Sequence, residues 1–470
     1  MRLRDLADVD SDSEVTGFAI DHRKVARGSV FGAFRGAKFN GEDFIGDAVE
    51  RGAVAVVARP DANASVPVLA DKEPRRLFAG LAAKFYAPFP EVVVAVTGTN
   101  GKTSTVEMTR QLWRMLGHRS ASIGTLGVTT SDDQVSTGLT TPDIVTFLNN
   151  MAGLKRMGIS HVAYEASSHG LDQHRAEGIP LAAAAFTNFS RDHLDYHETM
   201  DAYFDAKMRL FDDLLEPGKP AVIWTDDPKS GEVIKRAARR GHQVKTVGRK
   251  GETIRLVEQS PTALGQTLIL DHDGKTHRLA LPLIGAYQSA NVLTAAGLTL
   301  ATGGAWDATF AAMQRLAPVR GRLERAVISR AGVPVYIDYA HTPDALEAAI
   351  AALRAHVEGR LITVFGAGGD RDQGKRPQMG KVATELSDIA IVTDDNPRSE
   401  DPARIRADVM AGAPGALEVG GRREAIAEAI RIARAGDIVL VAGKGHETGQ
   451  IIGDKVLPFD DALVARECAA

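Results

Sequence analysis

Residues 97–104 read TGTNGKTS, and this stretch decides the fold of the central part of the chain. An apolar, β-branched run at 92–96 precedes it, and a helical pattern over 106–116 follows, with Gly117 as a helix stop. A strand, a glycine-bearing loop and a helix N-terminus together favour an anion, because the loop N–H groups and the helix dipole point at it. The stretch therefore predicts a phosphate-binding loop.

Two side chains of this loop suit a nucleotide. Lys102 can reach the β- and γ-phosphates, and the Thr103 hydroxyl can hold Mg²⁺. The full P-loop pattern has a glycine where this chain has Val96, so the loop is a shortened variant. A purely structural turn is the alternative interpretation, and the flanking strand and helix favour phosphate binding over it.

Length and composition indicate a globular protein of several domains. The chain has 470 residues, of which 25% are charged and 44% apolar, so three domains of ordinary size are expected. The net charge of −4 argues against a nucleic-acid partner. Because Cys468 is the one cysteine, no internal disulfide can form. The sequence shows neither a signal-peptide pattern nor an apolar run of membrane-spanning length. A cytoplasmic protein is expected.

The chain divides into three α/β segments, and we expect domains at 1–88, 89–317 and 318–470. Pro88 and Pro90 break the chain just before the strand that leads to the phosphate loop. In the second and third segments strands alternate with helices, which predicts parallel sheets with right-handed crossovers. The predicted fold class is α/β, with a small N-terminal domain, a central P-loop ATPase-like domain, and a doubly wound, Rossmann-like C-terminal domain.

Polar residues cluster where two strands of the central segment end. The strand at 161–165 ends in Glu165, and the strand at 183–187 runs into NFSRDHLD at 188–195. Ligands of parallel sheets bind outside the carboxyl ends of the strands, so these residues are expected beside the phosphate loop.

These clusters raise the question of a metal. His169, His174, His193 and His197 lie within a short span, so a zinc site has to be considered. The phosphate loop favours Mg²⁺ instead, which takes a few oxygen ligands together with substrate phosphates. Glu165 is the best carboxylate ligand, and His193 either binds the ion or positions a ligand. The alternative is that these side chains only cap turns and bond to the backbone.

A polar loop follows each predicted strand of the third segment. The strands at 333–337, 361–365, 388–392 and 437–441 run into DYAH (338–341), GAGGDRD (366–372), TDDNPR (393–398) and GKGHE (443–447). Four such loops predict one functional rim. Arg371 and Arg398, with Asp395 and Asn396 nearby, suit a substrate that carries both carboxylate and ammonium; a surface ion-pair network is the alternative. Glu447 either receives an ammonium group or caps the following turn.

Lys207 lies in a helical pattern at 203–209. From the residues alone, a solvated helix lysine is the favoured interpretation.

Together these motifs resemble the Mur ligase family over nearly the whole chain, and more closely its members that add meso-diaminopimelate. Residues 97–104 match the family's ATP loop, 165–175 its muramyl-peptide contact region, and 187–197 its metal and nucleotide region. Residues 338–344 open the C-terminal domain as in the family. The tetrapeptide DNPR at 395–398 matches the diaminopimelate-recognition motif, which lysine-adding relatives lack.

The resemblance implies roles residue by residue. It implies ATP contacts at Gly98, Thr99, Asn100, Gly101, Lys102, Thr103, Ser104, Asn291, Arg322 and Asp338. It implies contacts to the UDP-muramyl dipeptide at Thr140, Thr141, Ser167, Gln173 and Arg175, and to diaminopimelate at Arg371, Asp395, Asn396, Pro397, Arg398, Gly443 and Glu447. It implies catalytic roles for Lys102, Lys207, His193 and Asn188, and Mg²⁺ ligation by Thr103, Glu165, His193 and Lys207. Lys207 matches the lysine that the family carbamoylates, and a carbamate is an anion that can bind Mg²⁺.

The activity implied by the resemblance is an ATP-dependent ligation of meso-diaminopimelate to UDP-N-acetylmuramoyl-L-alanyl-D-glutamate through an acyl phosphate, in peptidoglycan precursor synthesis. The N-terminal domain would bind the uridine part, where His22 stands in place of a common serine. A cytoplasmic monomer without nucleic-acid or membrane partners is expected. Because the phosphate loop and the arginine-bearing loops fall in different domains, domain closure is expected as well.

Two rival interpretations remain at this point. One is another ligase of the superfamily, such as the D-alanyl-D-alanine-adding enzyme or folylpolyglutamate synthetase, and the DNPR tetrapeptide argues against both. The other is a nucleotide-gated binding or regulatory protein, which leaves the four polar strand ends of the third segment without a role.

Overall fold

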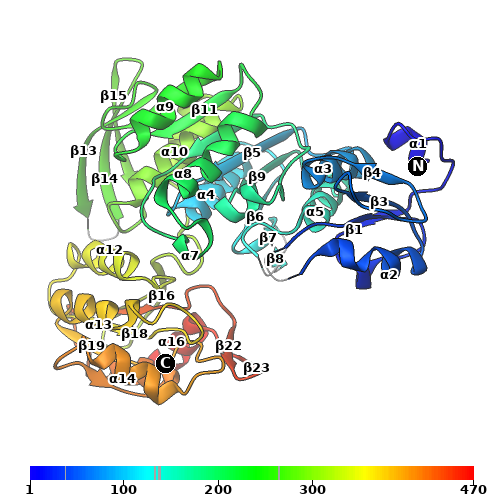
Figure 1. Ribbon diagram of the computed structural model, residues 1–470. Helices are drawn as coiled ribbons and strands as arrows, with labels where there is room; N and C mark the ends of the chain where they lie inside the picture. The colour runs from blue at the N-terminus through cyan, green and yellow to red at the C-terminus, as the bar shows by residue number, and fades with distance from the viewer. Residues whose placement is uncertain (37–38, 132–133, 136–138, 263–264) are drawn as a thin grey trace. The chain divides into compact units, whose positions relative to one another are not determined.

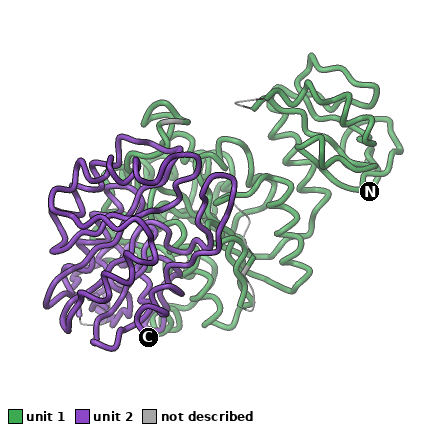
Figure 2. Tube along the Cα trace, turned by 90° about the horizontal axis from the view of Figure 1, so that it is seen from below, with its two compact units in different colours: residues 1–255, 291–312 green, residues 256–290, 313–470 purple. Residues whose placement is uncertain are grey.

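The computed structural model describes residues 1–36, 39–131, 134–135, 139–262 and 265–470. Its fold is α/β, as the sequence predicts (Figure 1). The chain forms two compact units: unit 1 comprises residues 1–255 and 291–312, and unit 2 comprises residues 256–290 and 313–470 (Figure 2). The expected domain boundaries after residues 88 and 317 stay predictions. Among the described residues, no helix combines the length and apolar character needed to cross a bilayer.

Unit 1 begins with a small parallel sheet in the order β1-β2-β3-β4. Its elements are β1 (Gly17–Ala19), β2 (Ser29–Gly32), β3 (Ala53–Ala58), β4 (Val68–Ala70), α1 (Leu3–Leu6), α2 (Ile45–Glu50) and α3 (Pro74–Tyr86), with 3₁₀ turns at His22–Lys24 and Gly41–Phe44. Alternate residues of β2 face opposite sides, as a strand requires. Val30 packs with Phe78 of α3, whereas Phe31 packs with Ala48 of α2.

The larger sheet of unit 1 runs in the order β12-β11-β10-β5-β9-β6-β7-β8. Its strands are β5 (Val92–Thr97), β6 (Ser120–Gly124), β7 (Gly127–Thr129), β8 (Gln134–Val135), β9 (His161–Glu165), β10 (Ala183–Phe186), β11 (Pro220–Trp224) and β12 (Gln243–Gly248). The strands from β12 to β6 are parallel, and β7 and β8 are antiparallel additions at one edge. β5 therefore lies between β9 and β10, so the phosphate loop is flanked by the polar ends of both neighbouring strands.

Helices connect these strands. They are α4 (Lys102–Met115), α5 (Ile144–Arg156), α6 (Ser168–Asp172), α7 (Leu194–His197), α8 (Met200–Arg209), α9 (Ser230–Arg239), α10 (Gln288–Ala301) and α11 (Trp306–Met313), with a π-helical turn at Leu210–Leu214. α4 begins at Lys102, four residues before the predicted start. Polar residues at this position predict a loop, but here they form the first turn of the helix and are buried within unit 1. Thr103, Ser104 and Thr105 are all at most 7% exposed.

The expectation that strands and helices alternate throughout 89–317 is wrong near its end. Three successive strands, β13 (Ile254–Thr262), β14 (Gly265–His272) and β15 (Lys275–Leu281), follow one another without a helix. β14 and β15 pair antiparallel from Gln266 opposite Leu281 to His272 opposite Lys275. The two residues that join them, Asp273 and Gly274, have φ values of 51° and 74°, which is the backbone of a tight hairpin turn.

Unit 2 holds the doubly wound sheet, in the order β16-β17-β21-β18-β19-β20. Its strands are β16 (Glu324–Ile328), β17 (Pro334–Asp338), β18 (Leu361–Phe365), β19 (Ile389–Val392), β20 (Leu417–Glu418) and β21 (Ile438–Ala442). From β17 to β20 neighbouring strands are parallel, and β16 is antiparallel at the edge. The predicted polar loops therefore leave the same edge of one sheet.

Helices cover both faces of this sheet. One face packs on α12 (Pro343–Arg354), α13 (Lys375–Leu386) and α14 (Pro402–Met410), and the other on α15 (Arg422–Ile432) and α16 (Asp461–Ala469). The alternation within β18 shows this plainly, since Leu361 and Phe365 pack with the first group and Ile362 and Val364 with the second. A hairpin of β22 (Gly449–Ile452) and β23 (Lys455–Pro458) follows β21.

Candidate active site

The phosphate loop of unit 1 has the backbone that an anion cradle needs. Gly98 and Gly101 have φ values of 146° and 82°, in the region that favours glycine. Gly101 is the N-cap residue of α4, so the N–H groups of the first helical turn point towards the loop. A Cβ at Gly101 would lie 2.3 Å from Oδ1 of Asn291, so this predicted nucleotide residue lies against the loop.

Gly98→Ala is expected to destroy the loop. Its Cβ would lie 2.0 Å from Oγ1 of Thr187, at a φ that side-chain-bearing residues rarely adopt. The strain is expected to cost about 1–3 kcal/mol and to displace the loop carbonyls. Thermal unfolding should shift downward and nucleotide binding, measured calorimetrically, should be lost. Gly231→Ala on α9, where nothing lies within 4 Å of the added Cβ, is the matched control; equal effects of the two changes would contradict the argument.

The loop is held from β10. Oδ1 of Asn188 accepts from the Asn100 N–H (2.8 Å), and Nδ2 of Asn188 donates to the Asn100 carbonyl (3.0 Å). The hydroxyl of Thr187 donates to the same carbonyl at 2.6 Å. Nζ of Lys102 donates to the carbonyls of Gly98 (2.9 Å) and Thr99 (2.8 Å), so the ammonium group folds back over the loop. The structure thus places Asn188 as a support for the loop, with Lys102 above it.

Lys207 is buried, and its interpretation as a solvated lysine is wrong. The residue is 1% exposed, its Nζ donates to the Gly98 carbonyl at 2.8 Å, and the nitrogen lies 4.3 Å from the centroid of the Tyr203 ring. Two ammonium groups, those of Lys102 and Lys207, therefore donate to one carbonyl oxygen. Burial, with Lys102 as a second cause, holds the pKa of Lys207 well below that of an ordinary lysine.

The predicted metal ligands follow the strands that flank β5: Glu165 is the last residue of β9, and His193 lies in the loop after β10. Glu165 is 2% exposed, and its Oε1 accepts from the Thr125 N–H at 2.7 Å. His193 caps α7 with a φ of 52°, and burial lowers its pKa, with Lys102 and Lys207 among the smaller causes. Within the described part of the chain, no three His, Cys, Asp or Glu side chains gather as a metal site. A carboxylate and a threonine hydroxyl beside a phosphate loop nevertheless fit Mg²⁺, which takes most of its ligands from phosphate and water.

The five residues expected to contact the muramyl dipeptide form one hydrogen-bonded network. The Thr141 hydroxyl donates to the Glu165 carbonyl (2.8 Å) and lies 2.9 Å from the Ser167 hydroxyl. Arg175 donates from Nη1 to the Thr141 carbonyl (3.2 Å) and from Nη2 to Oε1 of Gln173 (2.7 Å). The Thr140 hydroxyl is linked to Glu165 through that of Thr125. The structure therefore brings the dipeptide residues and the metal carboxylate together.

A cationic cavity of about 230 Å³ lies beside this network in unit 1. Arg35, Arg59, Arg75 and His174 are among its lining residues. The Arg75 guanidinium stacks on Phe34 with Cζ 4.9 Å from the ring centroid, and burial is the main cause that lowers its pKa, with Arg175 contributing. Arg75 is partly buried and its Nη2 donates to the Arg35 carbonyl (3.0 Å), and a partly buried guanidinium of this kind suits an anion.

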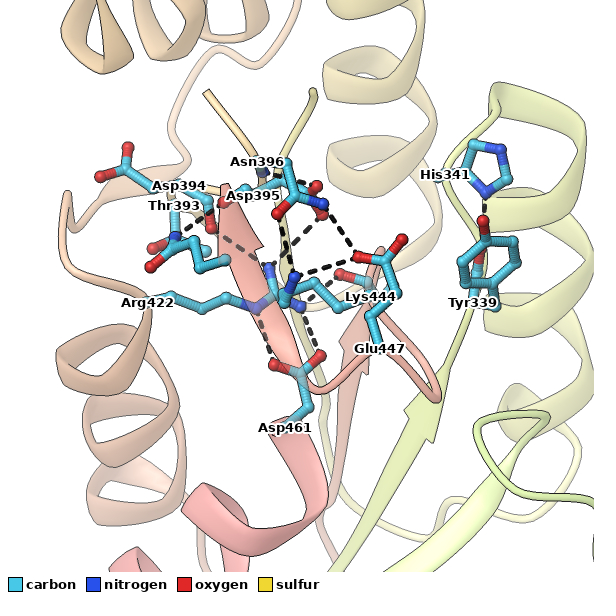
Figure 3. A network of polar contacts seen from close by, with 12 residues as sticks. Tyr339, His341, Thr393, Asp394, Asp395, Asn396, Arg422, Lys444, Glu447 and Asp461 are labelled. Carbon is cyan, nitrogen blue, oxygen red and sulfur yellow. Dashed lines mark hydrogen bonds and ion pairs between the residues drawn. The ribbon is translucent and has the colours of Figure 1, made fainter. Parts of the chain in front are cut away.

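The four polar loops of unit 2 leave one edge of its sheet, and residues of three of them, at 338–341, 393–398 and 443–447, are seen in Figure 3. Arg398 has a φ of 53°, and its Nη1 donates to the Gly369 carbonyl at 2.8 Å, which joins the loops after β18 and β19. Arg371, on the first of these loops, donates to the carbonyl of Asp370 (3.1 Å). Pro397 lies between Asn396 and Arg398 on the second loop. The prediction of one rim is confirmed as geometry, whereas the contacts of these residues with a substrate stay predictions.

Asp395 presents a carboxylate oxygen to this rim. Its Oδ1 accepts from the Asn396 N–H (2.7 Å), while Oδ2 is buried, has no hydrogen-bond donor among the described residues, and lies 4.0 Å from Nη1 of Arg422 as an ion pair. A Cβ at Gly443 would lie 2.5 Å from that Oδ2, so only glycine leaves the approach to the carboxylate open. A buried carboxylate oxygen of this kind suits a ligand's ammonium group.

Asp338 and Arg322, both expected to contact the nucleotide, lie close together in unit 2. Asp338 accepts from the N–H groups of Leu323 (2.7 Å) and Ala340 (2.9 Å). Burial raises the pKa of its carboxyl to about 6, although Arg322 and the two N–H groups act in the opposite direction. The Arg322 guanidinium lies over Tyr339, with Cζ 4.6 Å from the ring centroid. Both side chains thus lie near the carboxyl end of β17.

A glycine-bearing phosphate loop between two polar strand ends, in a chain that also carries a doubly wound unit with a charged rim, defines an α/β enzyme that uses a nucleotide. Family models match three successive segments: "Mur ligase family, catalytic domain" at 14–86, "Mur ligase middle domain" at 96–299 and "Mur ligase, glutamate ligase domain" at 321–445. The chain belongs to the Mur ligase family, as its motifs predict.

Relatives match the chain over nearly its whole length. It is 58% identical over 467 residues to a UDP-N-acetylmuramoyl-L-alanyl-D-glutamate–2,6-diaminopimelate ligase of Zymomonas mobilis, with 98% of this chain and 96% of the relative covered. The ligase of the same name from Agrobacterium fabrum is 50% identical, with 97% and 94% covered. A solved structure of a ligase of that name superposes with a TM-score of 0.75 at 32% identity, covering 100% and 98% of the two chains. A MurF ligase of Thermotoga maritima in complex with ADP shares the fold, with a TM-score of 0.63 at 20% identity and 92% and 94% covered.

Three residues near these sites escaped the sequence analysis. Arg75 lies in a helix whose pattern is ordinary, so the sequence carried no signal for it. Arg422 is 2% exposed and pairs with Asp461 beneath Asp395, and only the fold brings the two together. Lys444 is different, because it stands inside the quoted GKGHE loop beside Gly443 and Glu447. A lysine within a glycine-rich loop at a strand end was a usable signal.

Proposed function

We propose that the protein is an ATP-dependent ligase that joins meso-diaminopimelate to UDP-N-acetylmuramoyl-L-alanyl-D-glutamate in peptidoglycan precursor synthesis. The observation that carries the proposal is the composition of the rim in unit 2. A guanidinium group (Arg398) and carboxylates (Asp395, Glu447) stand on the loops that follow β19 and β21, which leave the same edge of the sheet. Cation and anion side by side suit an amino acid that carries carboxylate and ammonium groups at once.

The first step is activation of a carboxylate. The glutamate side chain of the bound muramyl dipeptide attacks the γ-phosphorus of ATP and forms an acyl phosphate, and ADP leaves. The Lys102 ammonium exchanges its bonds to the Gly98 and Thr99 carbonyls for phosphate oxygens, where it stabilises the charge on the transferring group. Mg²⁺, held by Thr103, Glu165, His193 and a carbamoylated Lys207, would supply further charge stabilisation at the phosphates.

The second step is amide formation. The neutral amine of diaminopimelate attacks the acyl carbon, the C–N bond forms, inorganic phosphate leaves with the electron pair of the C–O bond, and the nitrogen loses one proton to the departing phosphate. The muramyl dipeptide is held by the network of Thr141, Ser167 and Arg175, and the cavity beside Arg75 takes the diphosphate of its UDP group. Orientation of the two substrates contributes much of the acceleration.

The experiment that tests the function is a substrate screen with purified protein. ADP release at fixed ATP should require the UDP-muramyl dipeptide and should rise with meso-diaminopimelate. Turnover with lysine in place of diaminopimelate would contradict the assigned specificity. ATP hydrolysis that is independent of any amine would favour a nucleotide-gated regulatory protein instead. Gel filtration with light scattering checks the proposed monomer.

Arg398→Ala is expected to act on one substrate alone. Removing a guanidinium that binds a carboxylate should raise the KM for diaminopimelate about 30-fold or more, because the partner charge is left unpaired. The KM for ATP should change less than about twofold, since the nucleotide phosphates bind elsewhere. Steady-state kinetics with each substrate varied in turn measures both values. Arg423→Ala is the control, because it removes an exposed arginine of α15 that pairs with Glu467. An equal rise in the KM for ATP in Arg398→Ala would refute the role assigned to Arg398.

A further inference from the structure

Lys444 is a fully buried cation at the centre of the rim in unit 2 (Figure 3). It follows β21, and its relative exposure is 0%. Nζ donates to Oδ1 of Asn396 (3.2 Å), to Oε2 of Glu447 (3.0 Å) and to the carbonyl of Gly449 (2.6 Å). An ammonium group has three N–H donors, so the site matches its full bonding capacity. Lys444 is therefore part of the hydrogen-bonded structure of the rim.

The bonds of Lys444 fix the orientation of two predicted substrate residues. Oδ1 of Asn396 accepts from Lys444 and from the Ile451 N–H (2.9 Å), so the amide nitrogen of Asn396 turns the other way, to Oε2 of Glu447 (2.9 Å). Oε2 of Glu447 therefore receives two bonds, from an amide and from an ammonium. The Glu447 side chain remains 31% exposed, so its carboxylate is accessible at the rim. Its Oε2 is held by the bonds from Asn396 and Lys444.

The same ammonium group anchors the hairpin that holds Arg398. Lys444 bonds to the carbonyl of Gly449, the first residue of β22. Further along this hairpin, the Ile451 carbonyl accepts from the Arg398 N–H (3.0 Å), and the Gly453 N–H donates to the Arg398 carbonyl (2.7 Å). The left-handed backbone of Arg398, with φ 53°, is thus tied to the hairpin on both sides. Lys444 therefore bonds to the loop after β19 through Asn396, to Glu447 of its own loop, and to the hairpin through Gly449.

We propose that Lys444 is a positioning residue for amino-acid recognition, acting through Asn396 and Glu447. The inference rests on the proposed function for the identity of the amino acid. Without the ammonium, Oδ1 of Asn396 keeps only the Ile451 N–H as a donor, so the amide is held less firmly, and the carboxylate of Glu447 loses the cation that fixes its plane. A substrate ammonium then meets a carboxylate that is misaligned rather than absent.

The kinetic test compares Lys444→Met with Lys455→Met. Methionine keeps the length and the burial of the side chain and removes the charge, whereas Lys455 is an exposed residue of the same hairpin. The KM for diaminopimelate should rise about 10-fold to 100-fold in Lys444→Met, with the KM for ATP within about twofold, because a buried acceptor is left without its donor. Lys455→Met should change neither. A parallel rise of both KM values, or none, would overturn the proposal.

A double-mutant cycle tests whether Lys444 acts through Glu447. In a Glu447→Gln background the carboxylate is already gone, so adding Lys444→Met should raise the KM for diaminopimelate by less than about threefold. Multiplication of the two separate effects would overturn the proposal. Should Lys444→Met fail to fold, Lys444→Gln retains N–H donors in the same place, and its smaller KM rise must show the same dependence on Glu447.

A structural measurement separates this proposal from the proposed function. Crystal structures of the wild type and of Lys444→Met should differ in the Asn396 amide and the Glu447 carboxylate, with β21 and the remaining sheet unchanged. This comparison needs no substrate, so it decides the role of Lys444 even if the wild type shows no diaminopimelate-dependent turnover. Identical side-chain geometry in the two crystals would overturn the positioning role.

Discussion

Lys102→Met is expected to remove nearly all ATP-dependent turnover, with kcat lower by about 1,000-fold. The ammonium is positioned over the phosphate loop, where Nζ donates to the carbonyls of Gly98 and Thr99. A carbonyl is a weaker partner for a cation than a phosphate oxygen, so a nucleotide draws the ammonium away from its own loop. Because that bond strengthens as negative charge moves during phosphoryl transfer, its loss lowers kcat as well as affinity.

The same change should leave the fold intact. Lys102 and Lys207 donate to one carbonyl oxygen, and Lys102 is a cause of the lowered pKa of Lys207. In protein whose Lys207 is unmodified, removing one of two neighbouring cations relieves repulsion, so the thermal midpoint of Lys102→Met should equal or exceed that of the wild type. Lys84→Met, at an exposed position of α3, controls for the loss of a lysine. A kcat within tenfold of the wild type, measured as ADP release at saturating substrates, would contradict the assigned role.

The sequence predicts the central elements well where the pattern is local. A β-branched run, glycines and a helical period predict β5, the loop and α4, because each depends on residues adjacent in the chain. The start of α4 was missed because Thr103, Ser104 and Thr105 are polar by type and buried by context. The hairpin of β14 and β15 was missed although its Asp273-Gly274 turn, between alternating residues, is a direct signal for it.

The same distinction between local pattern and tertiary environment applies to the residues of the sites. That Glu165, Asn188 and the rim loops lie at strand ends follows from the parallel order of the strands, which the alternation predicts. The environment of a side chain does not follow, because it is set by residues far apart in the chain. Lys207 has the neighbours of a surface lysine in sequence, yet its partner is the Gly98 carbonyl, 109 positions away. Lys444 is buried by bonds that span 48 positions to Asn396.

Loss of Lys207 gives the second large effect that we expect. Its neutral amine is populated at lower pH than that of an ordinary lysine, since burial and Lys102 lower its pKa. A neutral amine adds to CO₂: the N–C bond forms, one proton is released, and the product is a carbamate anion. We expect this exchange to turn a site with two adjacent basic groups into one with a cation and an anion. Burial then shields the carbamate from water, with Lys102 as its counter-charge.

Both Lys207→Ala and Lys207→Arg should lower kcat about 1,000-fold, the second because a guanidinium keeps the charge but does not form a carbamate. Lys235→Ala, an exposed lysine on α9, should leave kcat unchanged. The chemical readout is independent of turnover: wild-type protein incubated with ¹³C-bicarbonate should show a carbamate carbon by NMR, and both Lys207 variants should lack it. A wild type without that signal would contradict the modification and leave the buried amine itself as the functional group. A Lys207→Arg variant that retains more than a tenth of the activity would contradict a catalytic role for both the amine and its carbamate.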